Sequence, residues 1–252
     1  MHAGTTWMQE LVDQIQNDGD MEKCQRAPIY KRIPFLELSF PPPPPLGVEV
    51  IEGMASPRVI KTHLHADLLP QSFWKQKCKM IYVARNIKDV IVSNYHFHRM
   101  SLFLPEPGTW EQFLQKSMAG EVLWGSWFDH MKKWWSRREK ADILYIFYED
   151  MKEDLARATG RVASFLGRKL SPEKIATVVR NTTFETMRDN PMTNYSTLKE
   201  VIWRMDTSQF MRKGHVGDWK HHFTAAQNEV LDQLITEQLK DTSLTFHYEL
   251  GG

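Results

Sequence analysis

Apolar residues recur in this chain with two different periods. Residues 58–62, 79–84 and 143–147 are short segments that carry Val, Ile, Tyr or Phe, and they predict buried strands. In residues 5–16, Trp7, Leu11, Val12 and Ile15 recur with helical spacing and predict a helix with one apolar stripe. The same spacing predicts helices over residues 86–100, 110–118, 124–138, 150–166, 172–180 and 225–239.

Strands that alternate with helices indicate an α/β fold, in which a central parallel sheet is flanked by helices. Because the chain has 252 residues and no internal repeat, we expect a single domain over residues 1–252. Sheets of this kind bind ligands at the carboxyl ends of their strands. Residues 61–63, Arg85 and Tyr148 come at the ends of predicted strands, so we expect them on one rim of the sheet.

Five consecutive prolines occupy residues 41–45. Proline lacks a backbone N–H, so this run cannot join a helix or a central strand. It predicts a stiff polyproline II loop at the surface. The alternative is a ligand for a proline-reading domain.

The composition is that of an ordinary soluble protein, with 42% hydrophobic and 25% charged residues. A net charge of +1 gives no general attraction to nucleic acid or membranes, so any anion site must be local. Cys24 and Cys78 form no CxxC pair, which argues against a disulfide scaffold and fits a reducing compartment. No apolar run reaches membrane-spanning length and no signal peptide is visible, so we expect a cytoplasmic protein.

Two segments are candidate anion sites. Residues 212–220 place Arg212 and Lys213 beside Gly214, and glycine lets a backbone approach a phosphate closely. Residues 4–7 (Gly-Thr-Thr-Trp) start a predicted helix, where backbone N–H groups and the helix dipole favour an anion. The alternatives are a solvated basic loop and an ordinary helix start with Thr as N-cap. The complete GxxxxGK[ST] motif is absent.

Further polar residues follow the predicted strands. Arg85 and Ser93, two helical turns apart, could hold a second phosphate, although Arg85 could instead pair with Asp89. Lys61 and His63 share a face of an extended segment. A neighbouring cation favours a neutral imidazole, so His63 is a candidate general base for a hydroxyl. A purely structural histidine is the alternative.

Two other kinds of site have weaker support. The pairs His63/His65 and His96/His98 have metal-ligand spacing, but neither has a nearby Cys or an evident third ligand, so we expect no metal site. A Ser-His-Asp hydrolase is disfavoured because the chain contains no G-x-S-x-G segment.

Taken together, these segments resemble the cytosolic sulfotransferases, most closely the phenol-type members and their 1C-like branch. The resemblance covers almost the whole chain, and the matching segments are residues 3–7, 22–27, 61–64, 82–86, 93–97, 107–110, 125–130, 147–152, 190–195 and 210–214. It implies transfer of a sulfonate from 3′-phosphoadenosine 5′-phosphosulfate (PAPS) to a hydroxyl or amine.

The resemblance also implies roles for individual residues. His63 would be the catalytic base, and Lys61 would steady the sulfonate and its leaving oxygen. The residues that would bind the nucleotide are Gly4, Thr5, Thr6 and Trp7 at the 5′-phosphate and adenine, Arg85, Ser93, Arg212, Lys213 and Gly214 at the 3′-phosphate, and Tyr148, Thr183, Phe184 and Met187 at the adenosine. No metal and no covalent enzyme intermediate are implied.

For the acceptor, the resemblance implies an apolar pocket suited to a small aromatic molecule. Its lining would be Lys61, His63, Phe35, Phe97 and Tyr195, together with Tyr30, Leu104 and Ile202. A family dimerisation segment is matched by Lys220, Thr224, Ala225 and Glu229. Ala225 stands where the family usually has valine, so we expect a weak homodimer.

The match departs from the family at position 2, where His2 replaces a lysine that assists departure of the phosphate. Family members also carry further residues upstream, including a central strand. The resemblance therefore predicts an N-terminally truncated variant that lacks the first strand and has low stability and turnover. Two alternatives follow: a catalytically impaired nucleotide-binding or dimerising variant, and a nucleotide kinase, which the missing phosphate-loop motif opposes.

Overall fold

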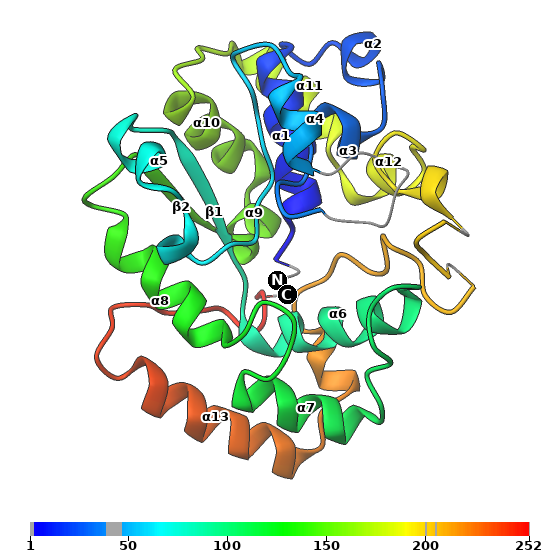
Figure 1. Ribbon diagram of the computed structural model, residues 1–252, viewed down its shortest axis with the longest axis vertical. Coiled ribbons are helices and arrows are strands. Elements are labelled where there is room, and N and C mark those ends of the chain that lie inside the picture. Colours follow the sequence, from blue (N-terminus) through cyan, green and yellow to red (C-terminus); the bar gives the residue numbers. More distant parts are fainter. Residues whose placement is uncertain (1–2, 39–46, 200, 205, 252) are drawn as a thin grey trace. The chain divides into compact units, whose positions relative to one another are not determined.

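The computed structural model describes residues 3–38, 47–199, 201–204 and 206–251 (Figure 1). His2 and the proline run 41–45 lie outside the described residues. The chain forms two compact units: the first contains residues 1–3, 65–155 and 199–252, and the second contains residues 4–64 and 156–198. None of the helices in the described ranges has the length and apolar character needed to cross a membrane.

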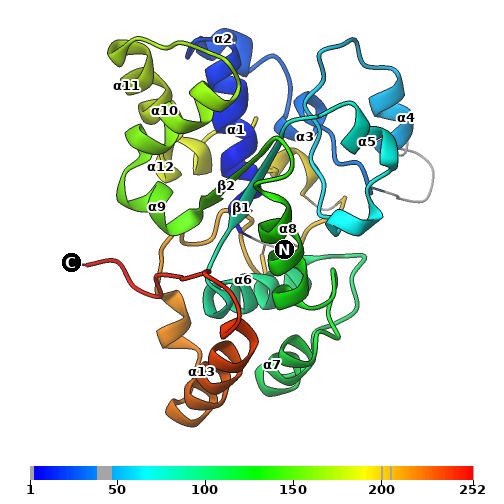
Figure 2. The ribbon, with the colours of Figure 1, turned by 90° about the vertical axis from the view of Figure 1, so that its left-hand side faces the viewer.

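The first unit contains a parallel pair of strands, β1 (Met80–Ala84) and β2 (Ile143–Phe147), which lie side by side in Figures 1 and 2. The register aligns Met80 with Ile143 and Ala84 with Phe147. Both strands consist mostly of β-branched and aromatic residues, which fit a pleated, covered surface. The predicted strands at residues 79–84 and 143–147 are therefore confirmed, and so is an α/β fold with a parallel sheet flanked by helices.

Helices make up much of the remainder of the first unit, and several begin at a polar N-cap. Asn86 caps the helix after β1, and Thr109 and Thr224 form complete capping boxes. The helices are η1 (Ala66–Leu68), α5 (Gln71–Lys75), α6 (Ile87–Met100), α7 (Trp110–Ala119), α8 (Trp127–Arg137), α9 (Tyr148–Glu153), η3 (Asp218–His221) and α13 (Ala225–Leu239).

The second unit is mainly helical, and its helix α1 packs against α2, α3 and α11 (Figure 2). The predicted helix at residues 5–16 is confirmed with the same bounds. The helices are α1 (Thr5–Gln16), α2 (Met21–Cys24), α3 (Ile29–Arg32), α4 (Gly47–Glu52), α10 (Leu155–Phe165, in this unit from Ala156 on), α11 (Pro172–Asn181), α12 (Phe184–Arg188) and η2 (Ser196–Leu198).

The predicted strand at residues 58–62 is wrong, because only a single parallel bridge forms there, between Phe35 and Lys61. The Lys61 N–H donates to Pro34 O, and Leu36 N donates to Lys61 O. The ladder between these two segments does not extend past Pro34, because proline has no N–H to donate. It stops on the other side because the His63 N–H donates to the Glu37 carboxylate, at 2.6 Å. Residues 61–63 therefore follow no strand, and they belong to the second unit rather than to the sheet that carries Arg85 and Tyr148.

The helix predicted over residues 150–166 is in fact two helices, α9 and α10, separated at Asp154. Asp154 takes an extended conformation, with φ −143° and ψ 87°. Aspartate is a weak helix-interior residue and favours positions at helix starts, which apolar periodicity does not detect. Likewise, α8 begins only at Trp127, because Trp124 and Gly125 have positive φ and Ser126 is the N-cap.

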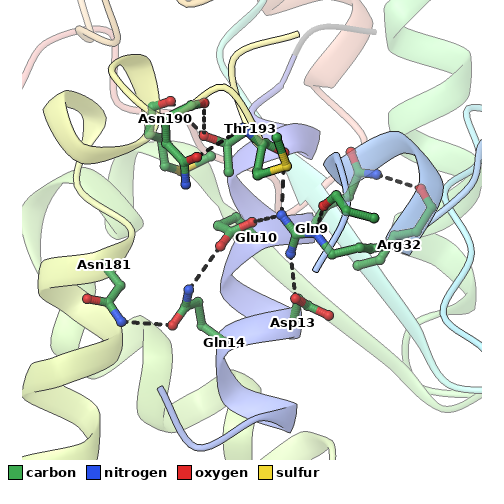
Figure 3. Close-up of polar contacts among 12 residues, drawn as sticks. Gln9, Glu10, Asp13, Gln14, Arg32, Asn181, Asn190 and Thr193 are labelled. Atoms are coloured by element: carbon green, nitrogen blue, oxygen red, sulfur yellow. Dashed lines mark hydrogen bonds and ion pairs between the residues drawn. The ribbon is translucent and has the colours of Figure 1, made fainter. Parts of the chain in front are cut away.

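Helix α1 buries polar residues as well as its predicted apolar stripe (Figure 3). The Arg32 guanidinium donates to Glu10 Oε2 at 2.7 Å and also pairs with Asp13. Arg26 donates to both oxygens of Asp13, at 3.0 and 2.8 Å, and Gln14 donates to Glu10 Oε1 at 3.0 Å. The polar face of α1 is thus matched by partners inside the second unit and is not the solvated face that a single apolar stripe suggests.

Candidate functional site

Arg85 and Tyr148 lie together in the first unit, at the carboxyl ends of β1 and β2. They follow Ala84 and Phe147, which are paired in the sheet register. The Arg85 guanidinium carbon lies 4.3 Å from the centroid of the Tyr148 ring. Burial raises the pKa of Tyr148, although the Arg85 charge opposes that effect. Tyr148 is therefore a protonated, largely apolar platform beneath a cation.

Arg85 has a carboxylate partner but retains hydrogen-bonding capacity. Its Nη2 donates to His215 O at 2.7 Å and lies 3.4 Å from Asp89 Oδ2. Pairing with Asp89, the alternative considered from the sequence, is thus present. Among the described residues, however, the buried Nε of Arg85 has no hydrogen-bond partner. A guanidinium with an unsatisfied buried donor is suited to a phosphate or sulfate oxygen.

Glu149 and Asn86 hold the start of α6; the sequence indicates Asn86 as a helix cap, and that is confirmed, but the role of Glu149 was missed. Glu149 Oε1 accepts from the Asn86 backbone N at 2.8 Å and from the Asn86 side chain at 2.9 Å. Burial raises the pKa of Glu149, although its hydrogen bonds with Asn86 oppose that effect. Asn86 in turn caps α6 by accepting from Asp89 N at 2.9 Å. The sequence signal for these two residues was an amide or acidic residue two positions after the end of a predicted strand.

The basic segment 212–218 carries its own counter-ion. Arg212 Nη2 lies 2.5 Å from Asp218 Oδ2, and Lys213 Nζ lies 2.6 Å from Asp218 Oδ1. Burial opposes ionisation of Asp218, but the hydrogen bonds from Lys213 and Arg212 lower its pKa to about 2. Gly214 and Gly217 have positive φ, 68° and 92°, as their glycine identity suggested. The two cations are thus fixed by a buried carboxylate and not simply solvated.

Gly4 is the N-cap of helix α1 and adopts a left-handed conformation, with φ 91° and ψ 22°. Glycine contributes no capping side chain, and no side-chain cap is formed at this N-terminus. The alternative in which Thr is an ordinary N-cap is therefore wrong. The first backbone N–H groups of a helix have no intrahelical acceptor, so the turn at Thr5, Thr6 and Trp7 offers donors to an anion.

Trp7 connects the start of α1 to the junction between α11 and α12. Its indole Nε1 donates to Thr182 O at 2.7 Å. The next residue, Thr183, is the N-cap of α12, and its Oγ1 accepts from Thr186 N at 3.2 Å. Phe184 begins α12, and Met187 on the same helix is buried. The second unit thus brings together the candidate adenosine contacts at positions 7, 183, 184 and 187.

Lys61 and His63 form one cluster with Phe35 and Glu37. The Lys61 Nζ lies 4.6 Å from the Phe35 ring centroid, and the His63 and Phe35 rings are edge-to-face at 5.3 Å. Glu37 Oε1 accepts from His63 N at 2.6 Å and from Thr62 Oγ1 at 2.8 Å. Burial lowers the pKa of Lys61 to about 8, although the charge of Glu37 opposes that effect. Glu37 was missed from the sequence, yet it fixes the backbone of the candidate base.

The candidate acceptor aromatics are divided between the two units. In the second unit, Tyr30 and Tyr195 have ring centroids 5.7 Å apart, and Tyr195 has a positive φ of 62°. Burial raises the pKa of Tyr195 to about 12, although a hydrogen bond with Thr6 opposes that effect. In the first unit, Phe97 packs against Trp203 at 4.9 Å, and the Ile202 carbonyl accepts from Leu102 N at 3.1 Å. Leu104 N donates to Ser101 Oγ at 3.1 Å.

In both pairs with metal-ligand spacing, the two histidines have different partners in the structure. His96 Nε2 lies 3.1 Å from Nε2 of His222, whereas His98 Nδ1 lies 3.2 Å from Pro105 O. The His63 ring packs against Phe35, whereas His65 Nε2 lies 2.9 Å from Trp124 O. Within the described part of the chain, no group of three His, Cys, Asp or Glu residues is arranged to hold a metal ion.

A family model described as the sulfotransferase domain matches residues 2–243. This chain belongs to the sulfotransferase family. The similarity to curated sulfotransferases supports its place near the 1C branch. It is 51% identical to human sulfotransferase 1C2 over 98% of its own length and 83% of that protein. It is 48% identical to bovine sulfotransferase 1A1, over 98% of this chain and 84% of that protein.

Solved structures extend the similarity of this sulfotransferase to three dimensions. Retinol dehydratase, in complex with androsterone and the inactive cofactor PAP, matches with a TM-score of 0.89 at 29% identity. That match covers 98% of this chain and 80% of the other. Mouse sulfotransferase SULT7A1 complexed with PAP matches with a TM-score of 0.77 at 31% identity, over 96% of this chain and 81% of that one.

The sulfotransferase thus carries its candidate residues in separate groups. The first unit contains Arg85, Ser93, Tyr148, Arg212, Lys213, Gly214 and Phe97, and the second contains Gly4, Thr5, Thr6, Trp7, Thr183, Phe184, Met187, Lys61, His63, Phe35 and Tyr195. Within each unit, residues far apart in sequence meet: Arg85 with Tyr148, and Trp7 with the residue next to Thr183. These contacts between distant segments indicate the candidate ligand-binding positions in each unit.

Proposed function

We propose that this sulfotransferase transfers the sulfonate group of PAPS to the hydroxyl or amine of a small aromatic acceptor by in-line displacement. The observation that carries the proposal is the family match over residues 2–243. Two structurally similar proteins, retinol dehydratase and mouse SULT7A1, were solved with PAP, the desulfonated form of this donor. The local geometry of each unit supports the assignment of individual roles.

In the first unit, Arg85 and Ser93 bind the 3′-phosphate together with Arg212, Lys213 and Gly214. The unsatisfied Nε of Arg85 supports this role, because a phosphate oxygen would supply the missing acceptor. Asp218 already orients Arg212 and Lys213, whose side chains are 23% and 44% exposed. Their remaining donors are therefore available with little loss of side-chain entropy. Tyr148, held under Arg85, contacts the adenosine.

In the second unit, Gly4, Thr5 and Thr6 hold the 5′-phosphate through the N-terminal turn of α1. Trp7 stacks near the adenine, and its ring orientation is fixed by the hydrogen bond to Thr182 O. Thr183, Phe184 and Met187 contact the adenosine from the start of α12. Because Trp7 and the α11–α12 junction are already connected, we expect these contacts to be largely preformed.

Catalysis then depends on alignment, proton removal and charge stabilisation. When bound, PAPS supplies a sulfonate that is already electrophilic. His63 removes the proton from the acceptor hydroxyl, and Glu37 keeps the His63 backbone in place. Lys61 contributes a partly buried positive charge near the leaving oxygen, where a low dielectric strengthens its effect. We expect general-base catalysis to contribute a factor of about 10²–10⁴.

We propose that Phe35 and Tyr195 contact the acceptor together with Lys61 and His63 in the second unit. Phe97, in the first unit, is the remaining substrate-binding candidate. Retinol dehydratase was solved with androsterone and, in another structure, with retinol. Ligands of that size support a pocket lined mainly by aromatic and aliphatic side chains. The ring of Phe35 lies against both Lys61 and His63, so it is the first candidate for contact with an aromatic acceptor.

Three broader features remain proposals: a single sulfotransferase domain over residues 1–252, a cytoplasmic location and a weak homodimer. The dimer would involve Lys220, Thr224, Ala225 and Glu229. All four residues are exposed, and Thr224 is the N-cap of α13, which fixes the geometry of this surface. Lys220 already pairs with Glu249 at 2.7 Å, so its contribution to an interface would require exchange of that partner.

The function is tested by titration calorimetry with PAP and by turnover of labelled PAPS with a simple phenol. We expect the wild type to bind PAP and turn over, and we expect His63→Ala to bind PAP normally while kcat falls at least 100-fold. His221→Ala, which changes an exposed histidine on η3, is the matched control and should keep full turnover. Binding of PAP without wild-type turnover would establish the impaired-variant alternative. Absence of PAP binding would exclude the proposed function altogether.

A further inference from the structure

One face of α6 holds the segment that contains Arg212 and Lys213. Asp89 Oδ2 accepts from Gly217 N at 2.9 Å, and Asp89 Oδ1 accepts from Trp219 N at 3.1 Å. About two turns further along the same helix, His96 Nε2 lies 3.1 Å from His222 Nε2. The helix therefore contacts this segment at two points, separated by the position of Ser93.

The protons of the two imidazoles can be assigned from their partners. His222 Nδ1 lies 3.2 Å from Asp218 O, and a carbonyl oxygen can only accept, so Nδ1 carries a proton. In an uncharged His222 ring, Nε2 is then the acceptor, and His96 donates to it through its own Nε2. A directed series of hydrogen bonds results, from His96 to His222 to the backbone of Asp218.

The charges around His96 favour this uncharged arrangement. Burial and the positive charges of Arg212, His222 and Arg99 lower its pKa to about 4, opposed only by Asp218. Tyr95 on α6 and Trp110 on α7 also contact the pair, through ring contacts to His96 and to His222 respectively. His96 is therefore a neutral ring at physiological pH, and the pair lies among α6, α7, η3 and the basic segment.

We propose that His96 and His222 are positioning residues for the cations that bind the 3′-phosphate. Asp218 links the parts, because its carbonyl accepts from His222 while its carboxylate binds Arg212 and Lys213. Moving His222 would move Asp218, and with it both cations. The inference rests on the proposed function, since it names what fixes the phosphate-binding side chains of that site.

A metal ion does not account for this pair of histidines. Two imidazole nitrogens alone make a poor site for zinc or copper, which require three or four protein ligands. The part of the chain that the structure describes supplies no third His, Cys, Asp or Glu in a suitable arrangement. A direct hydrogen bond between the rings accounts for their 3.1 Å separation.

The test measures how strongly the protein prefers PAP to adenosine 5′-monophosphate, which lacks the 3′-phosphate. In His222→Asn the amide lies near the former Nδ1 and retains the bond to Asp218 O, but it cannot reach His96. We expect the ratio of the two dissociation constants to fall about fivefold in this variant. His222→Gln retains a polar atom near the former Nε2 and should keep most of the ratio. His221→Asn, at the exposed neighbouring position, should leave it within about twofold of wild type.

His96→Asn provides a second route to the same result if His222→Asn does not fold. It should lower the ratio by a similar factor, and the double variant should lower it no further, because both changes break one hydrogen bond. Equal loss of PAP and adenosine monophosphate affinity would indicate general damage and overturn the proposal, as would an unchanged ratio in both single variants. A wild type that shows no preference for PAP would instead refute the proposed function.

Discussion

The two units bury charge in different ways. In the second unit, the side chains of Arg32, Glu10 and Asp13 are 1%, 2% and 3% exposed, so this triad is enclosed, and only Arg26, the second partner of Asp13, reaches the surface. In the first unit, the Asp218 side chain is 3% exposed, whereas Arg212 and Lys213 are 23% and 44% exposed. A fully enclosed cluster can only hold the protein together. A buried carboxylate under half-exposed cations leaves donors directed at solvent, which is the arrangement an anion site requires.

The largest expected effect is on the enclosed cluster. Replacing Arg32 with Met leaves Glu10 buried without its cation, while Asp13 keeps only Arg26, and we expect a loss of about 3–5 kcal/mol in the free energy of unfolding. Urea denaturation followed by circular dichroism measures it. The matched control is Arg168→Met, because the Arg168–Asp18 pair is 43% and 42% exposed. Its removal should cost less than about 1 kcal/mol. Similar losses in both variants would contradict the distinction between enclosed and exposed pairs.

An Arg→Met substitution in the half-exposed cluster of Asp218, Arg212 and Lys213 should affect PAP binding more than stability. In Arg212→Met, Asp218 keeps Lys213 as a partner, so the free energy of unfolding should change by no more than about 1 kcal/mol. The affinity for PAP should fall about 10- to 100-fold, as expected for loss of a charge-assisted hydrogen bond. Calorimetric titration, combined with the urea experiment, separates the two effects. A variant that loses stability while it keeps its affinity would reverse the assignment.

Acid should reveal the internal ion pair of the basic segment. The folded pKa of Asp218 is about 2, below the value of about 3.9 for an unpaired aspartate. The folded state therefore binds fewer protons between these values, and stability should fall as the pH drops from about 4 to 2. The contribution is at most about 3 kcal/mol. Urea unfolding at several pH values tests this, and the slope in that window should be smaller in Asp218→Asn than in wild type.

The smallest expected effect, and the most specific, concerns Lys61. This cation of the second unit lies over the Phe35 ring. Its pKa of about 8 means that it loses its charge as the pH rises through that value. If the charged form is required, kcat/KM should decline above about pH 8, by roughly tenfold at pH 9. Lys61→Arg keeps its charge at this pH, so its residual activity should not show the same alkaline decline. An identical decline in both proteins would point to a different group.

Local patterns in the sequence predicted the strands and most long helices, because these depend on the spacing of apolar residues. The helix at residues 5–16 and the strand at 143–147 have the predicted bounds. The strand at 58–62 was not foreseeable as a single bridge, because Pro34 and the Glu37 carboxylate end the ladder from another segment. Pattern analysis reports what one segment favours, and it contains no information about the hydrogen-bonding groups of its partner.

The same limit applies to the candidate site. Motif spacing selected Arg85, Tyr148, Arg212 and Lys213, and the structure joins these residues in pairs within one unit. The supporting residues Asp218, Glu149 and Glu37 were not identified, because an acidic residue near a basic motif is more often solvated than buried. Burial depends on tertiary packing, and the pKa shift of Asp218 exists only once Arg212 and Lys213 have folded back on it.

The spacing of contacts along α6 restricts how this helix can change in length. Asp89, Ser93 and His96 recur at intervals of four and three residues, which keeps them on one side of the helix. Inserting or deleting one residue between them would rotate everything beyond it by about 100° and direct His96 away from His222. Surface loops tolerate changes of this kind at modest cost. We therefore expect this sulfotransferase to accept new residues in its loops far more readily than a one-residue change within α6.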